Sequence, residues 1–194
     1  MKHIGRKLYH LLGGIGLLSL YYVLGRDTAL MVYAVFFGAV LAADIARLKI
    51  PAINQFVFVR FGSFIRQNEA NKLTGTPPYI LGIGLTLYLY SPAVATAAIC
   101  FLAFGDVSAT AIGERWGRTK IGDKSLEGTA GFAAAALVAG FLISMVGIHL
   151  APVVIVAGAL IAAGVELIPL PVNDNLVIPL VSGGIMELLV RCPG

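Results

Sequence analysis

The residue most suggestive of chemistry is Asp106, a carboxylate in the middle of an apolar stretch that runs from Cys100 to Gly113. A charged side chain at the centre of a bilayer costs at least about 2.5 kcal/mol unless it is paired or faces water. A regular helix would place Asp106, Gly113 and Gly117 on one stripe that leads to the polar loop after the stretch. We therefore expect Asp106 to belong to a functional site; an aspartate that only packs against a neighbouring helix is the alternative.

That loop, residues 113–128, has a composition suited to binding an anion. It contains two arginines, two lysines and four glycines. Small residues let backbone N–H groups approach a phosphate closely, and basic side chains neutralise its charge. Ser125 precedes the next apolar run, so a helix that starts there would direct its positive N-terminal end to the same anion. The alternative is the ordinary excess of basic residues in cytoplasmic loops.

Two further polar clusters precede apolar runs. Arg6 and His10 are one helical turn apart at the start of the first run, and Lys7 follows Arg6. Glu69 and Thr74 stand directly before the third run and supply an acid and a hydroxyl group. The alternatives are ordinary topological charge for Arg6 and Lys7, and a polar helix end for His10.

Acidic and amide side chains also flank the last apolar run. Asp174 and Asn175 stand before it and offer hard oxygen ligands of the kind that a Mg²⁺-bound nucleotide requires. Capping of a helix start is the alternative for this pair. Glu187 lies near the far end of the run, where an ion pair with Arg191 at i+4 explains it better than chemistry does.

The apolar composition of the chain predicts which elements position these residues. Of 194 residues, 58% are hydrophobic and 12% are charged, and the mean hydropathy is +0.89. Soluble domains average roughly 45–50% apolar and 25% charged residues, so a soluble enzyme, a coiled coil and a disordered tail are excluded. Because about 20 apolar residues span a bilayer, the chain has room for about seven crossings.

We expect an all-α, multi-pass transmembrane helical bundle that forms a single domain over residues 1–194. Apolar runs bounded by polar clusters place its spans at 8–25, 28–47, 77–91, 92–113, 128–147, 150–168 and 174–190. The first run lacks a clear cleavage site and is interpreted as a retained anchor. Residues 50–68 are too polar to cross, and their apolar residues recur at helical spacing. This pattern predicts an amphipathic helix along the cytoplasmic interface, either a connector or a gate for a lipid substrate.

The basic residues predict the orientation. With a cytoplasmic N-terminus, twelve of the fourteen Lys and Arg residues fall in cytoplasmic segments, and only Arg26 and Arg191 fall outside. Such an excess is typical of cytoplasmic loops, so all the polar clusters should share the cytoplasmic face. The net charge of +4 is then a topological signal, and no nucleic-acid partner is expected. Cys100 and Cys192 imply neither a disulfide nor a metal site.

Six segments form a combination that covers nearly the whole chain. They are Arg6-Lys7 with His10, Glu69 with Leu73-Thr74-Gly75, Gly105-Asp106-Val-Ser-Ala109, Gly113-Glu-Arg-Trp-Gly-Arg-Thr-Lys120, Lys124-Ser-Leu-Glu-Gly128 and Asp174-Asn175-Leu-Val-Ile-Pro179. In this order they resemble the blocks of the polyprenol kinase family. That family contains dolichol kinase, phytol kinase and the CTP-dependent diacylglycerol kinase.

The resemblance implies a multi-pass enzyme that transfers the γ-phosphoryl group of CTP to the hydroxyl group of a membrane lipid alcohol, with Mg²⁺ or another divalent cation. The alcohol would be a polyprenol or dolichol, phytol or a related isoprenoid alcohol, or diacylglycerol. The positions that the resemblance marks as needed for activity are Arg6, Lys7, Asp106 and Gly113. The positions that it marks as a nucleotide-binding block are Lys124, Ser125, Glu127 and Gly128.

Phosphoryl transfer depends mainly on positioning and on charge neutralisation, so we assign residues to those tasks. The metal ligands are Asp106 and Asp174. The nucleotide contacts outside the block are Arg118, Lys120 and Asn175. The groups that could accept the proton of the lipid hydroxyl are Asp106, Glu69 and His10, and the sequence does not choose among them.

Two other functions remain open. Phosphatidate cytidylyltransferases also use CTP and have similar segments, but here the loop is short and Asp174-Asn175 replaces their second acidic pair, which favours a kinase. A transporter would also place Asp106 and Glu187 in spans, yet it predicts a polar path across the bilayer, whereas the polar residues crowd one side. We expect the cell membrane of a prokaryote with the active site facing the cytoplasm, and the oligomeric state is unknown.

Overall fold

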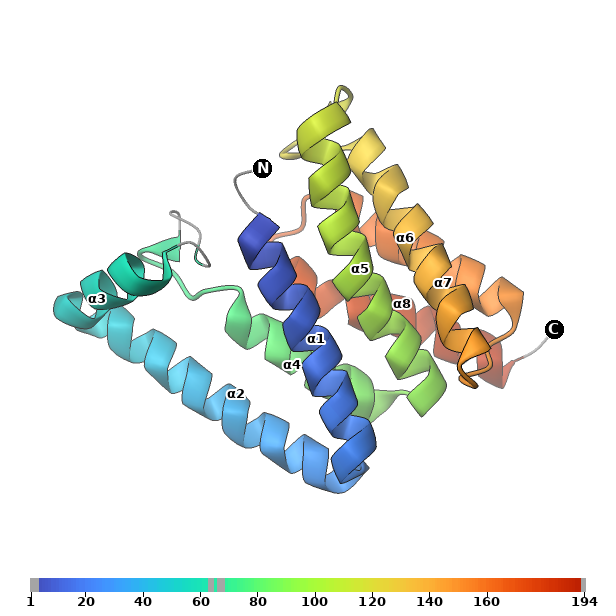
Figure 1. The fold of residues 1–194 in the computed structure, drawn as a ribbon, viewed down its shortest axis with the longest axis horizontal. Coiled ribbons are helices and arrows are strands. Elements are labelled where there is room, and N and C mark those ends of the chain that lie inside the picture. The colour runs from blue at the N-terminus through green and yellow to red at the C-terminus, as the bar shows by residue number, and fades with distance from the viewer. Residues whose placement is uncertain (1–3, 63–64, 66–68, 193–194) are drawn as a thin grey trace.

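The chain folds into helices joined by short connections (Figure 1). The computed structural model describes residues 4–62, 65 and 69–192, and describes the side chains from residue 7 onward. The helices are α1 (Ile4–Leu24), α2 (Arg26–Lys49), α3 (Pro51–Phe61), α4 (Thr76–Leu89), α5 (Pro92–Trp116), α6 (Leu126–Met145), α7 (Pro152–Leu167) and α8 (Asp174–Arg191). The strands β1 (Lys120–Ile121) and β2 (Lys124–Ser125) pair antiparallel between α5 and α6.

Each of the seven predicted apolar runs forms a helix whose ends differ from the prediction by a few residues. Four helices, α1, α2, α5 and α6, are long and apolar enough to cross a membrane. The apolar helices α4 and α7 have 14 and 16 residues. At 1.5 Å per residue these two are shorter than a bilayer core of about 30 Å. The structure thus supports a membrane protein with four candidate spans, and a total of seven stays a prediction.

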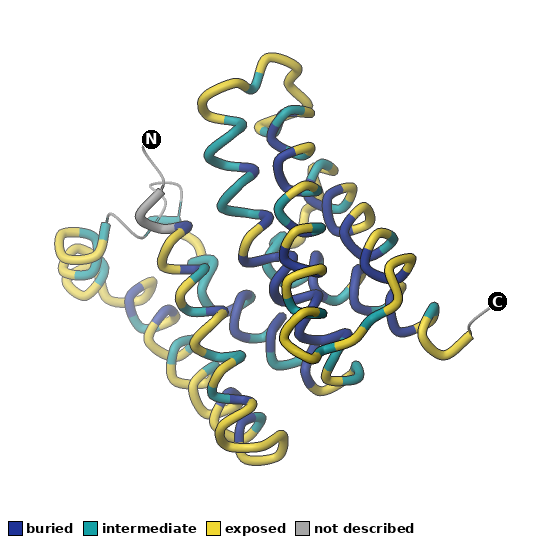
Figure 2. The backbone as a smooth tube through the Cα atoms, turned by 45° about the vertical axis from the view of Figure 1, so that its right-hand side comes forward, coloured by how far each residue is buried: buried dark blue, intermediate teal, exposed yellow. Residues whose placement is uncertain are grey.

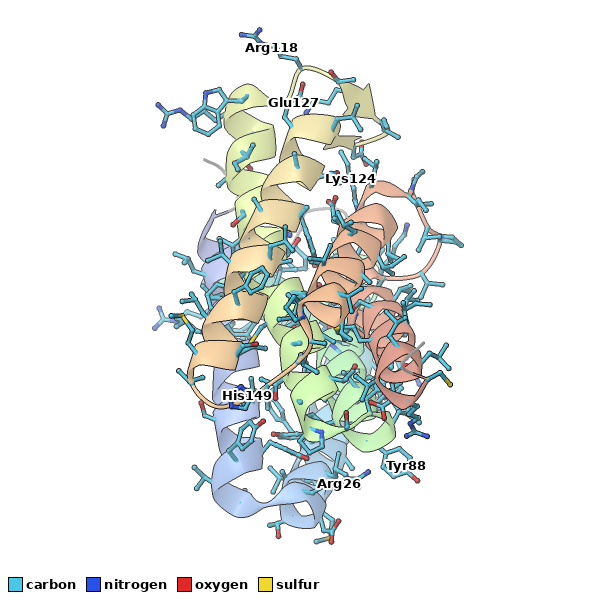
Figure 3. The ribbon with its side chains drawn as sticks, turned by 90° about the vertical axis from the view of Figure 1, so that its right-hand side faces the viewer. Arg26, Tyr88, Arg118, Lys124, Glu127 and His149 are labelled. Carbon is cyan, nitrogen blue, oxygen red and sulfur yellow. The ribbon has the colours of Figure 1, made fainter. Side chains whose placement is uncertain are left out.

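Consecutive long helices reverse direction, so their ends collect in two regions. One region, which we call the polar end, contains the N-terminal ends of α1, α4, α6 and α8 and the C-terminal ends of α2, α5 and α7. Figure 3 shows Lys124, Glu127 and Arg118 at this end and Arg26 and His149 at the opposite one. The reversal therefore carries motifs that are far apart in sequence to one side of the molecule.

α5 is the central helix, and small residues allow its neighbours to approach closely. Twelve of its 25 residues are buried, and Figure 2 shows the buried part of the chain concentrated around it. A Cβ atom on Gly105 of α5 would lie 2.6 Å from the ring of Phe132 on α6, and one on Gly131 of α6 would lie 2.4 Å from Ile112 of α5. Because Gly105 and Gly131 have no side chains, α5 and α6 can pack closely against each other.

α2 and α3 form the open side of the fold. α2 leaves α1 at Gly25, whose φ of 77° favours glycine. The buried residues of α2 lie near its two ends: Ala29, Tyr33, Asp44 and Arg47. Figure 1 shows α1 and α2 diverging from their shared turn toward the polar end.

α3 differs from the amphipathic helix that was expected over 50–68. It ends at Phe61, and none of its residues is buried. Its apolar residues surround the helix instead of forming one face, because four of them are consecutive, from Phe56 to Val59. Residues 63–64 and 66–68 of the expected helix lie outside the described residues.

The loop between α5 and α6 contains the only strands of the described chain, which an all-α prediction did not include. Lys120 pairs with Ser125 and Ile121 with Lys124. Gly122, with φ of 60°, occupies the first of the two turn positions, where a hairpin of this length favours glycine. The hairpin fixes Lys124 and Ser125 directly before the first turn of α6.

Candidate active site

Asp106 forms an ion pair with Lys7 that joins the middle helix α5 to the first turns of α1. The two side chains are 19% and 10% exposed, so the pair is largely shielded. His10, one turn after Lys7, is also buried. Its ring meets that of Tyr79 on α4 edge to face, with 4.6 Å between the centroids, and the Tyr79 hydroxyl donates a hydrogen bond to the His10 carbonyl oxygen. We call these four residues the Asp106 cluster.

A second cluster is centred on Lys124 of β2. Its ammonium group lies 2.6 Å from an Asp174 carboxylate oxygen and 3.6 Å from one of Glu166, and it also donates to the Glu166 backbone carbonyl. Glu166, on α7, is 7% exposed, and its other carboxylate oxygen accepts from the Thr129 hydroxyl at 3.1 Å. We call these four residues the Lys124 cluster. It joins the hairpin to the ends of α6, α7 and α8.

The two clusters are close enough to interact electrostatically. Lys124 attracts the Glu166 carboxylate, whereas Asp106 and Asp174, which carry the same sign of charge, repel it. Charges in a shielded setting act on one another more strongly than at an exposed surface. The polar end therefore holds a charged group with residues from α1, α5, α7, α8 and β2, beside which α4 and α6 place the neutral polar side chains of Tyr79 and Thr129.

Gly113, Gly117 and Gly128 surround the Ser125 side chain where α5 ends and α6 begins. Cβ atoms at these three positions would lie 3.2, 2.6 and 3.1 Å from the Ser125 hydroxyl oxygen. That oxygen accepts a hydrogen bond from the Gly128 N–H at 3.1 Å and so caps α6. These residues thus have a packing and capping role in the structure, and contact with a nucleotide stays a prediction for them.

Glu127 holds the loop before the hairpin in place. Its carboxylate accepts hydrogen bonds from the backbone N–H groups of Arg118 and Thr119, each at 3.1 Å, and from the Thr119 hydroxyl. The side chains of Arg118 and Lys120 are exposed, and Figure 3 shows Arg118 pointing away from Lys124. The structure therefore brings Lys124 to the charged group but leaves Arg118 and Lys120 outside it.

A buried ion pair on α2, absent from the predicted site, organises the segment before α4. Asp44 and Arg47 are 5% and 2% exposed, and their nearest side-chain atoms are 2.5 Å apart. Arg47 donates to the backbone carbonyls of Glu69 and Lys72, at 3.1 and 2.6 Å. Asp44 accepts from the N–H and hydroxyl groups of Thr74, at 2.6 and 3.0 Å. The available signal in the sequence was an acid and a base at i,i+3 on one helix face.

The pair brings the predicted segment around Glu69 next to the start of α8. A Cβ atom on Gly75 would lie 3.4 Å from the side-chain nitrogen of Asn175 and 3.8 Å from a carboxylate oxygen of Glu69. The Asn175 side chain donates to the Gly75 carbonyl at 3.4 Å, and Asn173, rather than Asp174, caps α8. Glu69 and Asn175 are thus neighbours, as a shared site requires. The side chain of Arg6 lies outside the described residues.

The carboxylates of Asp106 and Asp174 could hold a metal ion only together with further ligands. Within the described residues, no three His, Cys, Asp or Glu side chains are grouped closely enough to hold a metal ion. Asp106 and Asp174 each have a lysine as counter-ion. Mg²⁺ in nucleotide sites is commonly held by one or two carboxylates together with phosphates and water. The assignment of Asp106 and Asp174 as metal ligands, with a nucleotide supplying the remaining ones, stays a prediction.

At the end of the molecule opposite to the polar end, the polar groups of Glu187, Ser91 and Arg191 bind one another. Glu187 accepts from the N–H and hydroxyl groups of Ser91, at 2.9 and 2.8 Å, and pairs with Arg191 at 2.9 Å, which confirms the predicted i+4 pair. Between the two ends lies an apolar core that includes Phe101 and Phe132, both fully buried. The distribution favours chemistry at the polar end over a polar path through the molecule.

Comparison with known proteins adds one partial similarity. A stretch of 91 residues, 45% of this chain, is 29% identical to the CTP-dependent diacylglycerol kinase 1 of Schizosaccharomyces pombe. The matched part is 42% of that protein, so the chain spans less than half of the relative's length. No protein-family model matches the chain, and no solved structure matches it. The similarity supports a relationship to CTP-dependent lipid kinases in general.

Proposed function

We propose that this chain is a CTP-dependent kinase that transfers the γ-phosphoryl group of CTP to the hydroxyl group of a membrane lipid alcohol at the cytoplasmic face. The observation that carries the proposal is the convergence of the Asp106 and Lys124 clusters at the polar end, next to four candidate membrane spans. The choice of CTP is supported by the partial similarity to a CTP-dependent diacylglycerol kinase. A lipid hydroxyl at headgroup depth would meet the charged group from the membrane side.

In the proposed reaction, the lipid oxygen attacks the γ-phosphorus, the bond from that phosphorus to the bridging oxygen breaks, and CDP leaves. The proton of the hydroxyl passes to one of the three candidate bases: Asp106, Glu69 or His10. Lys124, supported by the start of α6, would attract the phosphates. A divalent cation would be held by Asp106 and Asp174 and would neutralise the charge that develops on the phosphates. Lys7 would then balance the charge that Asp106 keeps.

The test is label transfer by purified protein in detergent with Mg²⁺. γ-Labelled CTP or ATP is offered with a polyprenol, phytol, geranylgeraniol or diacylglycerol. We expect label on an alcohol with CTP only. A parallel reaction with α-labelled CTP distinguishes phosphoryl transfer from cytidylyl transfer, because label from the α-position on phosphatidate would identify a cytidylyltransferase and overturn the proposal. No transfer in either reaction would also overturn it.

Two acidic residues provide a matched pair of variants for this assay. Asp106→Asn removes a carboxylate from the polar end, and Glu187→Gln removes one from the opposite end. We expect the first to lower the rate at least ~100-fold, as loss of an electrostatic contact in a catalytic site does. The second should keep the wild-type rate, because the side-chain hydrogen bonds of Glu187 within the described chain go to Ser91 and Arg191, away from the polar end.

A further inference from the structure

A cavity of about 300 Å³ lies between α1, α2 and α4. α1 lines it from Tyr9 to Leu20, with Gly16 about midway, while Phe36 of α2 and Thr76 of α4 lie opposite. Except for Thr76 and the two tyrosine hydroxyls, its walls are hydrocarbon, aromatic rings and glycine. Two of the helices that line it, α1 and α2, diverge toward the polar end (Figure 1). We call it the α1–α2–α4 groove.

The groove begins at the charged group. Tyr79 lines it and also contacts His10, which lies one helical turn after Lys7, the ion-pair partner of Asp106. If a lipid in the groove placed its polar head group beside Thr76, that head group would therefore lie within one helical turn of Tyr79, a member of the Asp106 cluster. A second cavity, of about 370 Å³, lies between α5 and α6 and includes Phe104 and Ala135, but it is lined by no member of the Asp106 or Lys124 clusters.

The length of the groove corresponds to one leaflet of a membrane. From Tyr9 to Leu20 the helix axis advances about 16 Å, roughly half of the ~30 Å hydrocarbon thickness. Tyr9 and Gly16 are exposed, so the groove is open on the side from which a lipid would enter. An extended hydrocarbon chain from one leaflet thus matches the groove in length, chemistry and direction of access.

We propose that the α1–α2–α4 groove binds the hydrocarbon chain of the lipid alcohol and presents its hydroxyl to the Asp106 cluster. The occupant is a single alkyl or isoprenoid chain, because a cavity of about 300 Å³ between three helices is narrow. This inference rests on the proposed function, since it assigns the chain-binding part of the same site. It also assigns a specificity role to Gly16, whose missing side chain keeps the groove open.

Gly16 allows a direct test. A Cβ atom on Gly16 would meet nothing within 4 Å, so a side chain at this position starts in open space and Gly16→Leu places hydrocarbon in the groove. Gly38 of α2 is the matched control, because its Cβ would also meet nothing within 4 Å and it does not line the groove. Both changes replace a helical glycine with leucine and gain the same helix propensity.

The first measurement is binding, which needs no turnover. Geranylgeraniol with a diazirine near its hydrocarbon end is photolysed with each protein in detergent, and the labelled peptides are identified by mass spectrometry. We expect labels on α1 and α4 in the wild type and in Gly38→Leu, and their loss in Gly16→Leu. Labels on the α5–α6 cavity, labels unaffected by Gly16→Leu, or no labels at all would overturn the inference.

The second measurement compares chain lengths during turnover. Gly16 lies about 10 Å along α1 from Tyr9, so a leucine there should shorten the groove. We expect Gly16→Leu to lower kcat/KM for geranylgeraniol at least ~10-fold, the size of effect that one hydrocarbon group has in an apolar pocket, and to leave kcat/KM for its half-length homologue geraniol unchanged. Equal losses for both alcohols would overturn the inference. If no alcohol is phosphorylated while the α1 and α4 labels are present, the kinase proposal fails and the groove assignment stands.

Discussion

Replacing Asp106 with Asn removes the negative charge that faces Lys7 while keeping the size of the side chain. Because the Lys7 side chain is only 10% exposed, its ammonium group would be left shielded without a counter-ion. Removal of one partner from a buried ion pair costs about 3–5 kcal/mol. Asp106 is itself 19% exposed, so we expect about 3 kcal/mol. For a chain of this length that loss lowers Tm by roughly 6–12 °C.

A double variant separates the structural role of this pair from a chemical one. Lys7→Met with Asp106→Asn removes both charges, and the shielded site is neutral again. Residues in contact show coupling energies of about 0.5–3 kcal/mol, so the double variant should regain much of the stability that each single variant loses. If Asp106 acts in the reaction, however, the double variant stays at least ~100-fold less active than the wild type.

The assay follows thermal unfolding in detergent and CTP-dependent lipid phosphorylation for the wild type, both single variants and the double variant. Stability that recovers while activity does not is the expected pattern. Recovery of both together would show that the ion pair only joins α1 to α5, and the assignment of Asp106 to the reaction would be withdrawn. The outcome depends on differences among four proteins, so it does not require an absolute rate.

Three further changes give measurable outcomes. Lys124→Ala should raise the CTP concentration for half-maximal activity at least ~10-fold, as loss of a charged contact does; an unchanged titration would leave Lys124 with a structural role. Gly105→Ala should destabilise the protein by about 1–3 kcal/mol because its Cβ meets the ring of Phe132 at 2.6 Å. Gly164→Ala, whose Cβ meets nothing within 4 Å, should leave the stability unchanged. Equal stabilities of the two variants would contradict the close packing of α5 against α6. Arg47→Gln should speed amide hydrogen exchange in residues 69–75 at least ~10-fold, and slow exchange there would show that other contacts suffice.

The seven helices other than α3 could be predicted from the sequence because each one is an apolar run that ends at charges, proline or glycine. The pair between Glu187 and Arg191 could be predicted for a similar reason, since both residues lie on one helix at a fixed spacing. Apolar runs and fixed spacings are local features of the sequence. They were enough to predict the positions of the helices and the fact that the polar motifs gather on one side of the molecule.

The contacts inside the candidate site depend on tertiary packing and could not be predicted. Lys7 and Asp106 are 99 residues apart in sequence, and no spacing rule relates them. Arg47 reaches carbonyl groups that lie 22 and 25 residues further along the chain, so its role became visible only when the end of α2 was placed beside that segment. The hairpin at Lys120 to Ser125 was missed because its strands have two residues each, too short for a periodic pattern.

The placement of the buried residues of α2 has a mechanical consequence. Ala29 and Tyr33 fix the helix near one end, and Asp44 and Arg47 fix it near the other. Phe36, which lines the α1–α2–α4 groove, lies between these two anchored parts of α2. A lipid chain in the groove would therefore contact a part of α2 that its buried residues do not hold directly.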